Sequence, residues 1–226
     1  MKVLVVSDTH GLHDLMPELP EADVFIHAGD FMNRGLSYEE IHSFRKWIEI
    51  NVRTPANRRY IVAGNHDILF DATHRESSAD TAANAVKALT AFGACMYVQE
   101  ESIEIDGVKF FFSPWTPEFF NWGFNAQRGA DIRTHWNKIP NDTNFLVTHG
   151  PPTGILDTII PGAADGHIGC DDLYDKVKEI KPKHHVFGHI HGSRGIVHGK
   201  TTFINASFLN ERYRPHPGYG YFLVEV

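Results

Sequence analysis

The chain has 226 residues, 42% of them hydrophobic, which is enough to bury one sizeable core. Its formal net charge of −7 argues against a general basic surface for duplex nucleic acid. Its two cysteines, Cys95 and Cys170, indicate neither a disulfide framework nor a thiolate metal cluster. No linker, low-complexity stretch or repeat divides the sequence, so we expect a single domain over residues 1–226.

Two further absences bear on where the protein resides. No apolar run approaches the ~20 residues that a membrane-spanning helix needs. The first residues lead directly into a strand-like run, without the long apolar core and cleavage site of a signal peptide. We therefore expect a cytoplasmic protein with no membrane partner, present as a monomer or a homodimer.

The first half of the chain alternates strand-like and helix-like segments. Three short apolar runs are typical of buried strands, at residues 3–6, 24–26 and 60–62. Residues 37–50 carry apolar side chains at helical spacing, with Ser37 as the expected N-cap and Glu40 completing a capping box. Residues 79–92 form an alanine-rich segment compatible with a second helix. This alternation predicts parallel strands joined by right-handed crossovers.

The second half contains hairpins, further strands and one short helix. Residues 102–105 and 108–112 flank Asp106-Gly107, a dipeptide typical of a tight hairpin turn. Residues 196–205 predict a second hairpin around Gly199. The remaining expected elements are an irregular aromatic segment, a helix, two buried strands and a final strand, at residues 113–124, 128–137, 144–148, 183–188 and 221–226. Together these elements predict an α/β fold (α+β in some schemes) of two packed mixed sheets with helices outside.

Five short segments carry side chains typical of metal ligands, and each follows an apolar run. They are Asp8-Thr9-His10, Gly29-Asp30, Gly64-Asn65-His66-Asp67, His149-Gly150 and Gly188-His189-Ile190-His191. Residues i and i+2 of an extended chain point to the same side, so the first and last segments each offer a pair of ligands. Because strand ends meet at one edge of a sheet, we expect the five segments to form one site.

The expected ligand set is larger than one tetrahedral zinc ion requires. It holds two aspartates, one asparagine and four histidines, while His66 remains free for acid–base chemistry. Such a set suits two divalent ions about 3.5–4 Å apart that share one carboxylate, as in two-metal hydrolases. A polar residue at a strand end explains any one segment, but it does not explain five in this order.

The order D-x-H, G-D, G-N-H-D, H-G, G-H-x-H resembles the calcineurin-like metallophosphoesterase superfamily, over residues 8–191. Finer matches are similar to its branch of metallophosphoesterase-domain-containing phosphodiesterases, at residues 7–13, 28–31, 113–117, 149–152, 186–191 and 205–207. The resemblance implies the four-layer sandwich of that superfamily, with two packed mixed β-sheets flanked by helices.

The resemblance also implies a role for each ligand. One ion would be held by Asp8, His10, Asp30 and His191. The other would be held by Asp30, Asn65, His149 and His189, so that Asp30 bridges the two. A hydroxide between the ions would attack phosphorus, and His66 would act as the general acid for the leaving oxygen. These ligand types suit Mn, Fe, Zn, Co or Ni, and we expect Mn to serve in vitro.

Three residues are candidates for contacts with the substrate. Arg34 resembles the arginine that follows the G-D motif in protein phosphatases of the superfamily; a surface arginine is the alternative. Trp115 or Trp122, in the aromatic segment 115–124, could stack a nucleobase or an aryl group. The alternative for this segment is a place in the core.

We therefore expect a metal-dependent phosphodiesterase that acts on small substrates, such as aryl phosphodiesters, with cyclic nucleotides as further candidates. A phosphomonoesterase or protein phosphatase with the same site is one alternative. A metal-loaded scaffold with little catalysis is another, and the complete ligand set and His66 argue against it. The acidic composition disfavours a DNA nuclease.

Overall fold

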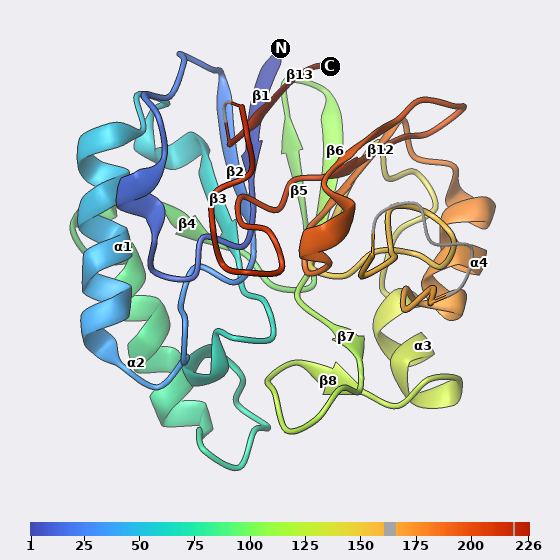
Figure 1. The fold of residues 1–226 in the computed structure, drawn as a ribbon, viewed down its shortest axis with the longest axis horizontal. Helices are drawn as coiled ribbons and strands as arrows, with labels where there is room; N and C mark the ends of the chain where they lie inside the picture. The colour runs from blue at the N-terminus through green and yellow to red at the C-terminus, as the bar shows by residue number, and fades with distance from the viewer. Residues whose placement is uncertain (161–165, 219) are drawn as a thin grey trace.

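Two β-sheets pack face to face between two pairs of helices (Figure 1). The computed structural model describes residues 1–160, 166–218 and 220–226. One sheet is covered by α1 (Tyr38–Asn51) and α2 (Ala79–Thr90), and the other by α3 (Ala130–Trp136) and α4 (Asp171–Ile180). The predicted arrangement of two mixed sheets flanked by helices is thus confirmed. Within the described ranges, no helix is long and apolar enough to cross a membrane.

The first sheet has the order β13-β1-β2-β3-β4, and β1 to β4 run parallel as predicted. Its strands are β1 (Lys2–Val6), β2 (Val24–Ala28), β3 (Arg59–Val62), β4 (Met96–Tyr97) and β13 (Phe222–Glu225). Helix α1 connects β2 to β3, and α2 lies between β3 and the short β4, which was not predicted. The final strand, β13, pairs antiparallel with β1 and forms one edge.

The second sheet has the order β11-β12-β10-β9-β6-β5, with a parallel centre and an antiparallel hairpin at each edge. Its strands are β5 (Glu101–Ile105), β6 (Val108–Ser113), β9 (Phe145–Thr148), β10 (His184–Phe187), β11 (Gly195–Val197) and β12 (Thr202–Asn205). Both predicted hairpins are confirmed. Asp106 and Gly107 have φ angles of 50° and 78°, the left-handed values that such a tight turn requires.

Short elements fill the loops between the main strands and helices. A two-stranded ladder, β7 (Thr116–Pro117) and β8 (Asn125–Ala126), brackets much of the aromatic segment. The described 3-10 turns are η1 (His13–Leu15), η2 (Ala56–Arg58), η3 (Ile68–Phe70), η4 (Ala91–Gly93) and η5 (His191–Ser193).

Alternate residues of the central strands face different layers of the core. Val3 and Val5 of β1 belong to the cluster between the sheets, together with Phe110 and Phe112 of β6. Leu4, which lies between the two valines, belongs instead to the cluster that includes the helices. Both faces of these strands are therefore buried, which explains their continuous apolar sequence.

Helix α1 begins after Ser37 as predicted, but the predicted capping box is wrong. Ser37 Oγ accepts a hydrogen bond from the Glu39 backbone N–H at 3.2 Å. The Glu40 carboxylate accepts instead from the backbone N–H groups of Asn33 and Arg34, at 2.8 and 3.4 Å. Glu40 thus stabilises the loop that follows β2 rather than the first turn of the helix.

Two other helical expectations differ from the structure. Helix α2 ends at Thr90 rather than Phe92, because Phe92 has a φ of 58° that a right-handed helix excludes. Helix α4 was not predicted, although Leu173, Val177 and Ile180 form its buried face. The helix is short and its first turn is acidic, so its apolar pattern is a weak signal in the sequence.

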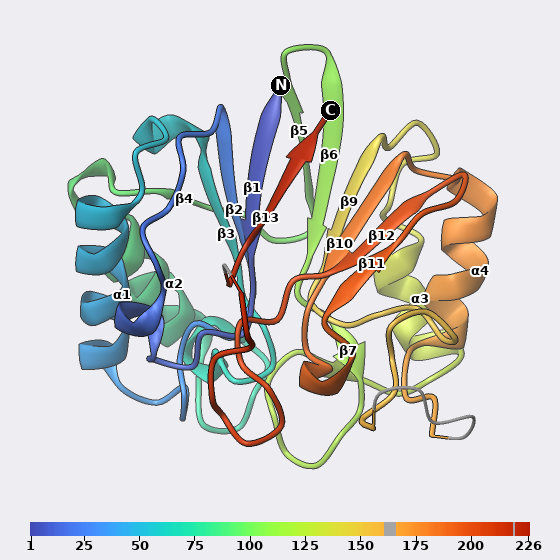
Figure 2. The same ribbon diagram turned by 45° about the horizontal axis from the view of Figure 1, so that its top comes forward.

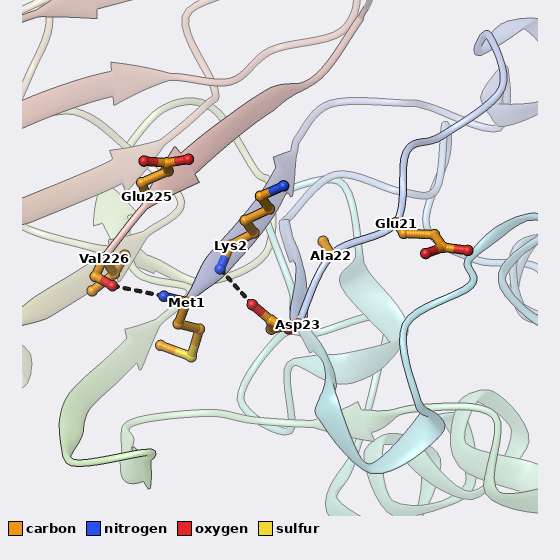
Figure 3. Close-up of a pocket in the computed structure, with 7 residues that line it drawn as sticks. All are labelled: Met1, Lys2, Glu21, Ala22, Asp23, Glu225 and Val226. Carbon is orange, nitrogen blue, oxygen red and sulfur yellow. Dashed lines mark hydrogen bonds between the residues drawn. The ribbon is translucent and has the colours of Figure 1, made fainter.

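The two chain ends lie together at the amino end of β1 (Figure 3). The Met1 ammonium group donates to the Val226 oxygen at 2.9 Å, and the Lys2 N–H donates to Asp23 Oδ2 at 2.7 Å. A cavity of about 800 Å³ is present here. It lies at the opposite end of β1 from Asp8 and His10, so it is separate from the predicted metal ligands.

Candidate metal centre

The five motif segments meet at the carboxyl edge of the two sheets. They follow β1 (Asp8, His10), β2 (Asp30), β3 (Asn65, His66), β9 (His149) and β10 (His189, His191). The sheets are joined at this edge, where the Ser7 N–H donates to Ala206 O at 3.1 Å and the Phe208 N–H donates to Ser7 O at 2.8 Å. Side chains from both sheets therefore reach the same place.

Donor atoms from these segments form one compact cluster. Atoms within 4.8 Å of one another come from three groups: Asp8, His10 and His191; His10, Asp30 and His66; and Asp30, His149 and His189. Asp30 Oδ2 lies 3.3 Å from His149 Nε2 and 3.7 Å from His10 Nε2. Asn65 Oδ1 lies 2.9 Å from His149 Nε2. All seven predicted ligands thus lie in the cluster, and Asp30 is at its centre.

The backbone of these segments is not extended. Asp8, His10, Asp30 and His189 have φ angles of 54°, 42°, 57° and 67°. Alternation along an extended chain, the predicted reason why the first and last segments each offer a pair of ligands, is therefore wrong, although those side chains do converge. A left-handed non-glycine residue costs of order 1 kcal/mol, and such residues gather where the surroundings and the function determine the conformation.

Asp67 connects the second and third segments and had no predicted role. Its buried carboxylate accepts hydrogen bonds from the N–H groups of Asp30, Met32 and Gly64, at 2.9, 2.9 and 2.8 Å. It therefore fixes the Asp30 loop against the Asn65 loop. The sequence signal was its place in G-N-H-D, directly after two functional side chains.

Two glycines allow the carboxylates to approach the backbone. A Cβ atom at Gly64 would lie 2.3 Å from Asp30 Oδ1, and one at Gly188 would lie 2.0 Å from Asp8 Oδ2. Neither separation is sterically possible, so the motifs require glycine at both positions.

Hydrogen bonds orient two of the imidazoles toward the cluster. His149 Nδ1 lies 2.9 Å from Ala28 O, and His191 Nδ1 lies 3.1 Å from Asn210 O. A carbonyl oxygen only accepts, so each Nδ1 donates a proton to it and each Nε2 faces the cluster. His10 Nε2 faces His191 Nε2 at 3.1 Å, an arrangement that a shared cation would satisfy.

The electrostatics of the cluster keep two imidazoles neutral, keep a carboxylate ionised, and favour the protonated form of a third imidazole. Burial lowers the pKa of His10 and His189 to about 3, which keeps both rings neutral. Burial opposes ionisation of Asp8, but the hydrogen bond and charge of His191 hold the pKa of this carboxyl well below its usual range. The Asp30 charge outweighs burial at His149 and raises its pKa to about 9, so metal binding there would release a proton.

His66 lies beside the cluster, and the structure holds its ring from two sides. Its Nδ1 is 2.7 Å from Asn33 O, and its backbone N–H donates to Asp30 Oδ1 at 2.7 Å. The ring stacks on Trp122, with centroids 3.9 Å apart. These contacts leave Nε2 available for proton transfer.

A cavity of about 510 Å³ opens over the cluster. The residues from the cluster that line it are Asp30, Asn65, His66, His189 and His191. Apolar and aromatic side chains form its outer wall: Pro117, Phe119, Trp122, Ile159, Ile168, Ile190 and Tyr213. Its charged lining residues beyond the cluster are Glu118, Arg128 and Glu211. The cavity is therefore larger than a phosphate group and mainly apolar away from the ligands.

The predicted substrate contacts occupy three different environments. Trp122 lines the cavity, whereas Trp115 is 9% exposed and stacks on His135 at 3.7 Å. Arg34 is exposed and is not among the residues that line the cavity. Tyr213, which had no sequence signal, does line it.

Comparison with known proteins agrees with this geometry. Residues 1–193 match the family model of the calcineurin-like phosphoesterases. The chain belongs to this family. It is 35% identical to human metallophosphoesterase domain-containing protein 1, over 95% of this chain and 68% of the relative. It is 38% identical to a Caenorhabditis elegans UPF0046 protein, over 93% of this chain and 71% of the relative.

Solved structures show the same fold at low sequence identity. Phosphopantetheinyl hydrolase from Mycobacterium tuberculosis matches with a TM-score of 0.61 and 14% identity, over 99% of this chain and 95% of that chain. Membership of the calcineurin-like phosphoesterases confirms the predicted resemblance. As a member of this family, the chain is a phosphoesterase that depends on divalent metal ions.

Proposed function

We propose that this calcineurin-like phosphoesterase hydrolyses small phosphodiesters with two divalent ions. The observation that carries the proposal is the position of Asp30. Its Oδ2 lies 3.7 Å from Nε2 of His10, a proposed ligand of the first ion, and 3.3 Å from Nε2 of His149, a proposed ligand of the second. A single carboxylate shared by two ligand sets is what a two-ion site requires.

The donor set fits two ions with oxygen and imidazole ligands. The first would be held by Asp8, His10, Asp30 and His191, and the second by Asp30, Asn65, His149 and His189. When bound, the ions would lower the pKa of a water molecule and neutralise charge on the phosphoryl oxygens. We propose Mn as the metal that serves in vitro. The same donor set also suits Fe, Zn, Co and Ni.

His66 is proposed as the general acid for the leaving group. Asn33 O accepts from Nδ1, so a proton given to the leaving oxygen comes from Nε2. The Trp122 stack and the bond to Asn33 restrict the ring to one orientation. Such positioned proton donors contribute about 10²–10⁴-fold when the leaving group is an alkoxide.

Charge and shape favour diesters over monoesters. A monoester carries a second negative charge, and among the described residues that line the cavity the one arginine or lysine is Arg128, which is already hydrogen-bonded. Arg128 donates to the carbonyl oxygens of Ile168 and Gly169, at 3.0 and 2.8 Å, while Glu118 and Glu211 add negative charge. The apolar wall provides room for the second ester group.

Trp122 is the proposed contact for an aryl group or a nucleobase. It lines the cavity beside His66, and stacking on an indole is worth about 1–3 kcal/mol per base. Aryl phosphodiesters and cyclic nucleotides are accordingly the proposed substrates. We further propose a cytoplasmic, single-domain protein that acts as a monomer or a homodimer.

The test is a substrate panel with metal-reconstituted protein. Purified protein is treated with EDTA, reloaded with Mn²⁺, and assayed with bis(nitrophenyl) phosphate, nitrophenyl phosphate and cyclic nucleotides. We expect kcat/KM for the diester to exceed that for the monoester by about tenfold or more, with Asp30→Ala as the inactive control. A preference for the monoester would exclude the diesterase proposal, and no hydrolysis of any ester would favour a scaffold.

A further inference from the structure

The loop between β12 and β13 lies beside the candidate ligands at the end of β10. Figure 2 shows this red loop next to η5, the turn that begins at His191. The Tyr213 ring contacts His10 and His191 edge-on, with centroid separations of 5.0 and 5.3 Å. Tyr213 also lines the cavity together with Asp30 and His66. It is therefore an aromatic wall directly beside the donor group formed by Asp8, His10 and His191.

Asn210 builds the loop that carries Tyr213. Its Oδ1 accepts from the N–H groups of Arg212 and Arg214, at 2.9 and 3.2 Å, and its N–H donates to Arg214 O at 2.8 Å. Its carbonyl oxygen accepts from the Tyr213 N–H at 2.8 Å and lies 3.1 Å from His191 Nδ1. One peptide carbonyl thus positions both the Tyr213 backbone and the His191 ring.

The conformation of Tyr213 carries an energetic cost that burial does not explain. Its φ of 54° is a left-handed value that strains the backbone of a bulky residue. The residue remains 44% exposed, so little hydrophobic stabilisation offsets this cost. Strain of this kind, held by a dedicated hydrogen-bonded loop, points to a function for the side chain.

The free polar atom of Tyr213 is its hydroxyl group. Within the part of the chain that the structure describes, this hydroxyl has no hydrogen-bond partner. A phenol hydroxyl carries one proton and can donate one hydrogen bond. Arg128, a cation in the cavity lining, already donates to Ile168 O and Gly169 O. Tyr213 is thus an uncommitted donor in a wall that is otherwise largely apolar.

We propose that the Tyr213 hydroxyl donates a hydrogen bond to a non-bridging phosphoryl oxygen of the bound ester. This assignment rests on the proposed function and adds a substrate-binding residue to it. His66 and Tyr213 both contact the His10 ring, with centroid separations of 4.5 and 5.0 Å, so both flank the same donor group. His66 serves the leaving oxygen, and Tyr213 serves an oxygen that stays on phosphorus. Tyr213 therefore acts equally on good and poor leaving groups.

The test uses Tyr213→Phe, which keeps the ring contacts with His10 and His191 and removes only the hydroxyl. Tyr174→Phe, on α4 and outside the residues that line the cavity, is the matched control. The Mn²⁺-loaded proteins are compared in kcat/KM for a nitrophenyl and an alkyl diester, in metal content, and in the Kd for inorganic phosphate by calorimetry.

We expect Tyr213→Phe to lower kcat/KM by about tenfold or more, by the same factor for both diesters, because a hydrogen bond to a charged oxygen is lost in each case. The Kd for phosphate should rise by a similar factor, while the metal content of Tyr213→Phe stays at the wild-type level. In Tyr174→Phe, kcat/KM and the Kd for phosphate should both match the wild type. Unchanged phosphate binding, a greater loss on the alkyl diester, or loss of metal would each overturn the assignment. If the wild type hydrolyses no ester, the proposed function fails, and the phosphate Kd alone still tests Tyr213.

Discussion

The imidazole of His66 stacks on the indole of Trp122, with ring centroids 3.9 Å apart and planes inclined by 22°. The stack joins the proposed general acid to the aromatic wall of the cavity. Trp122 thereby has two possible effects, one on the substrate and one on the orientation of His66. Variants at these two positions separate the effects.

Replacing Trp122 by Ala should raise KM for nitrophenyl or nucleotide diesters by roughly 5- to 30-fold, because a stacking surface worth about 1–2 kcal/mol is lost. Trp122→Phe should restore much of this loss. Steady-state kinetics and melting temperature are the measurements, with metal content and melting temperature expected near wild type.

Trp115→Ala is the contrasting variant. Because Trp115 is 9% exposed and packs on Phe124 and His135, its truncation should lower the free energy of unfolding by about 3–5 kcal/mol. KM of the folded fraction should not change. A normal KM for Trp122→Ala, with an altered KM for Trp115→Ala, would reverse the assignment.

His66→Ala should keep its metal but lose proton donation. Hydrolysis of alkyl diesters should fall by about 10²–10⁴-fold, and hydrolysis of nitrophenyl diesters by much less, because nitrophenolate leaves without a proton. Rates for a series of leaving groups, together with elemental analysis, test this. Equal losses across the series would exclude His66 as the general acid.

Much of the fold was predictable because the strands are buried on both faces. The runs at β1, β2, β3 and β9 are continuous apolar sequences, and a polar ligand follows each one. Helix α4 escaped prediction because its apolar residues recur only three times among charged ones. The capping box at Ser37 failed because Glu40 finds backbone donors in a loop, a tertiary contact that local pattern does not contain.

The site was predictable as a set of residues but not as a geometry. The motifs predicted the ligand residues. The left-handed conformations of Asp8, His10, Asp30 and His189 are instead accompanied by hydrogen bonds from their N–H groups to distant segments, which local sequence does not reveal. Trp115 and Trp122 have the same local sequence character, and only folding buries one and leaves the other in the cavity wall. Tyr213 lies in a loop without a motif, and its place beside His191 depends on Asn210.

Asp67→Asn should destabilise the protein without removing a proposed ligand. One of the two oxygens that accept from Asp30, Met32 and Gly64 is replaced by a donor, and an unsatisfied buried group costs about 1–3 kcal/mol. Urea unfolding of the EDTA-treated protein is the measurement, with exposed Asp142→Asn as control. Equal stability of the two variants would exclude a structural role for Asp67.

Acid should destabilise the fold through His185. Burial lowers the pKa of His185 to about 3 in the folded protein, below its ordinary value of 6.5. The unfolded chain therefore takes up a proton first, and stability falls as the pH drops from about 6.5 toward 3. Over that window, the free energy of unfolding should change with pH more steeply in the wild type than in His185→Gln, by about 1.4 kcal/mol per pH unit. Parallel profiles from urea unfolding would contradict this contribution.

The bridging role of Asp30 is tested most directly by counting metal ions while activity is followed. Calorimetric titration of EDTA-treated wild type with Mn²⁺, checked by elemental analysis, should give two bound equivalents, with diesterase activity rising as the second binds. Asp30→Ala, which removes the carboxylate that lies between His10 and His149, should lose tight binding of both ions and activity together. Two tightly bound equivalents in Asp30→Ala, or full diesterase activity in wild type with a single ion, would contradict the two-ion account.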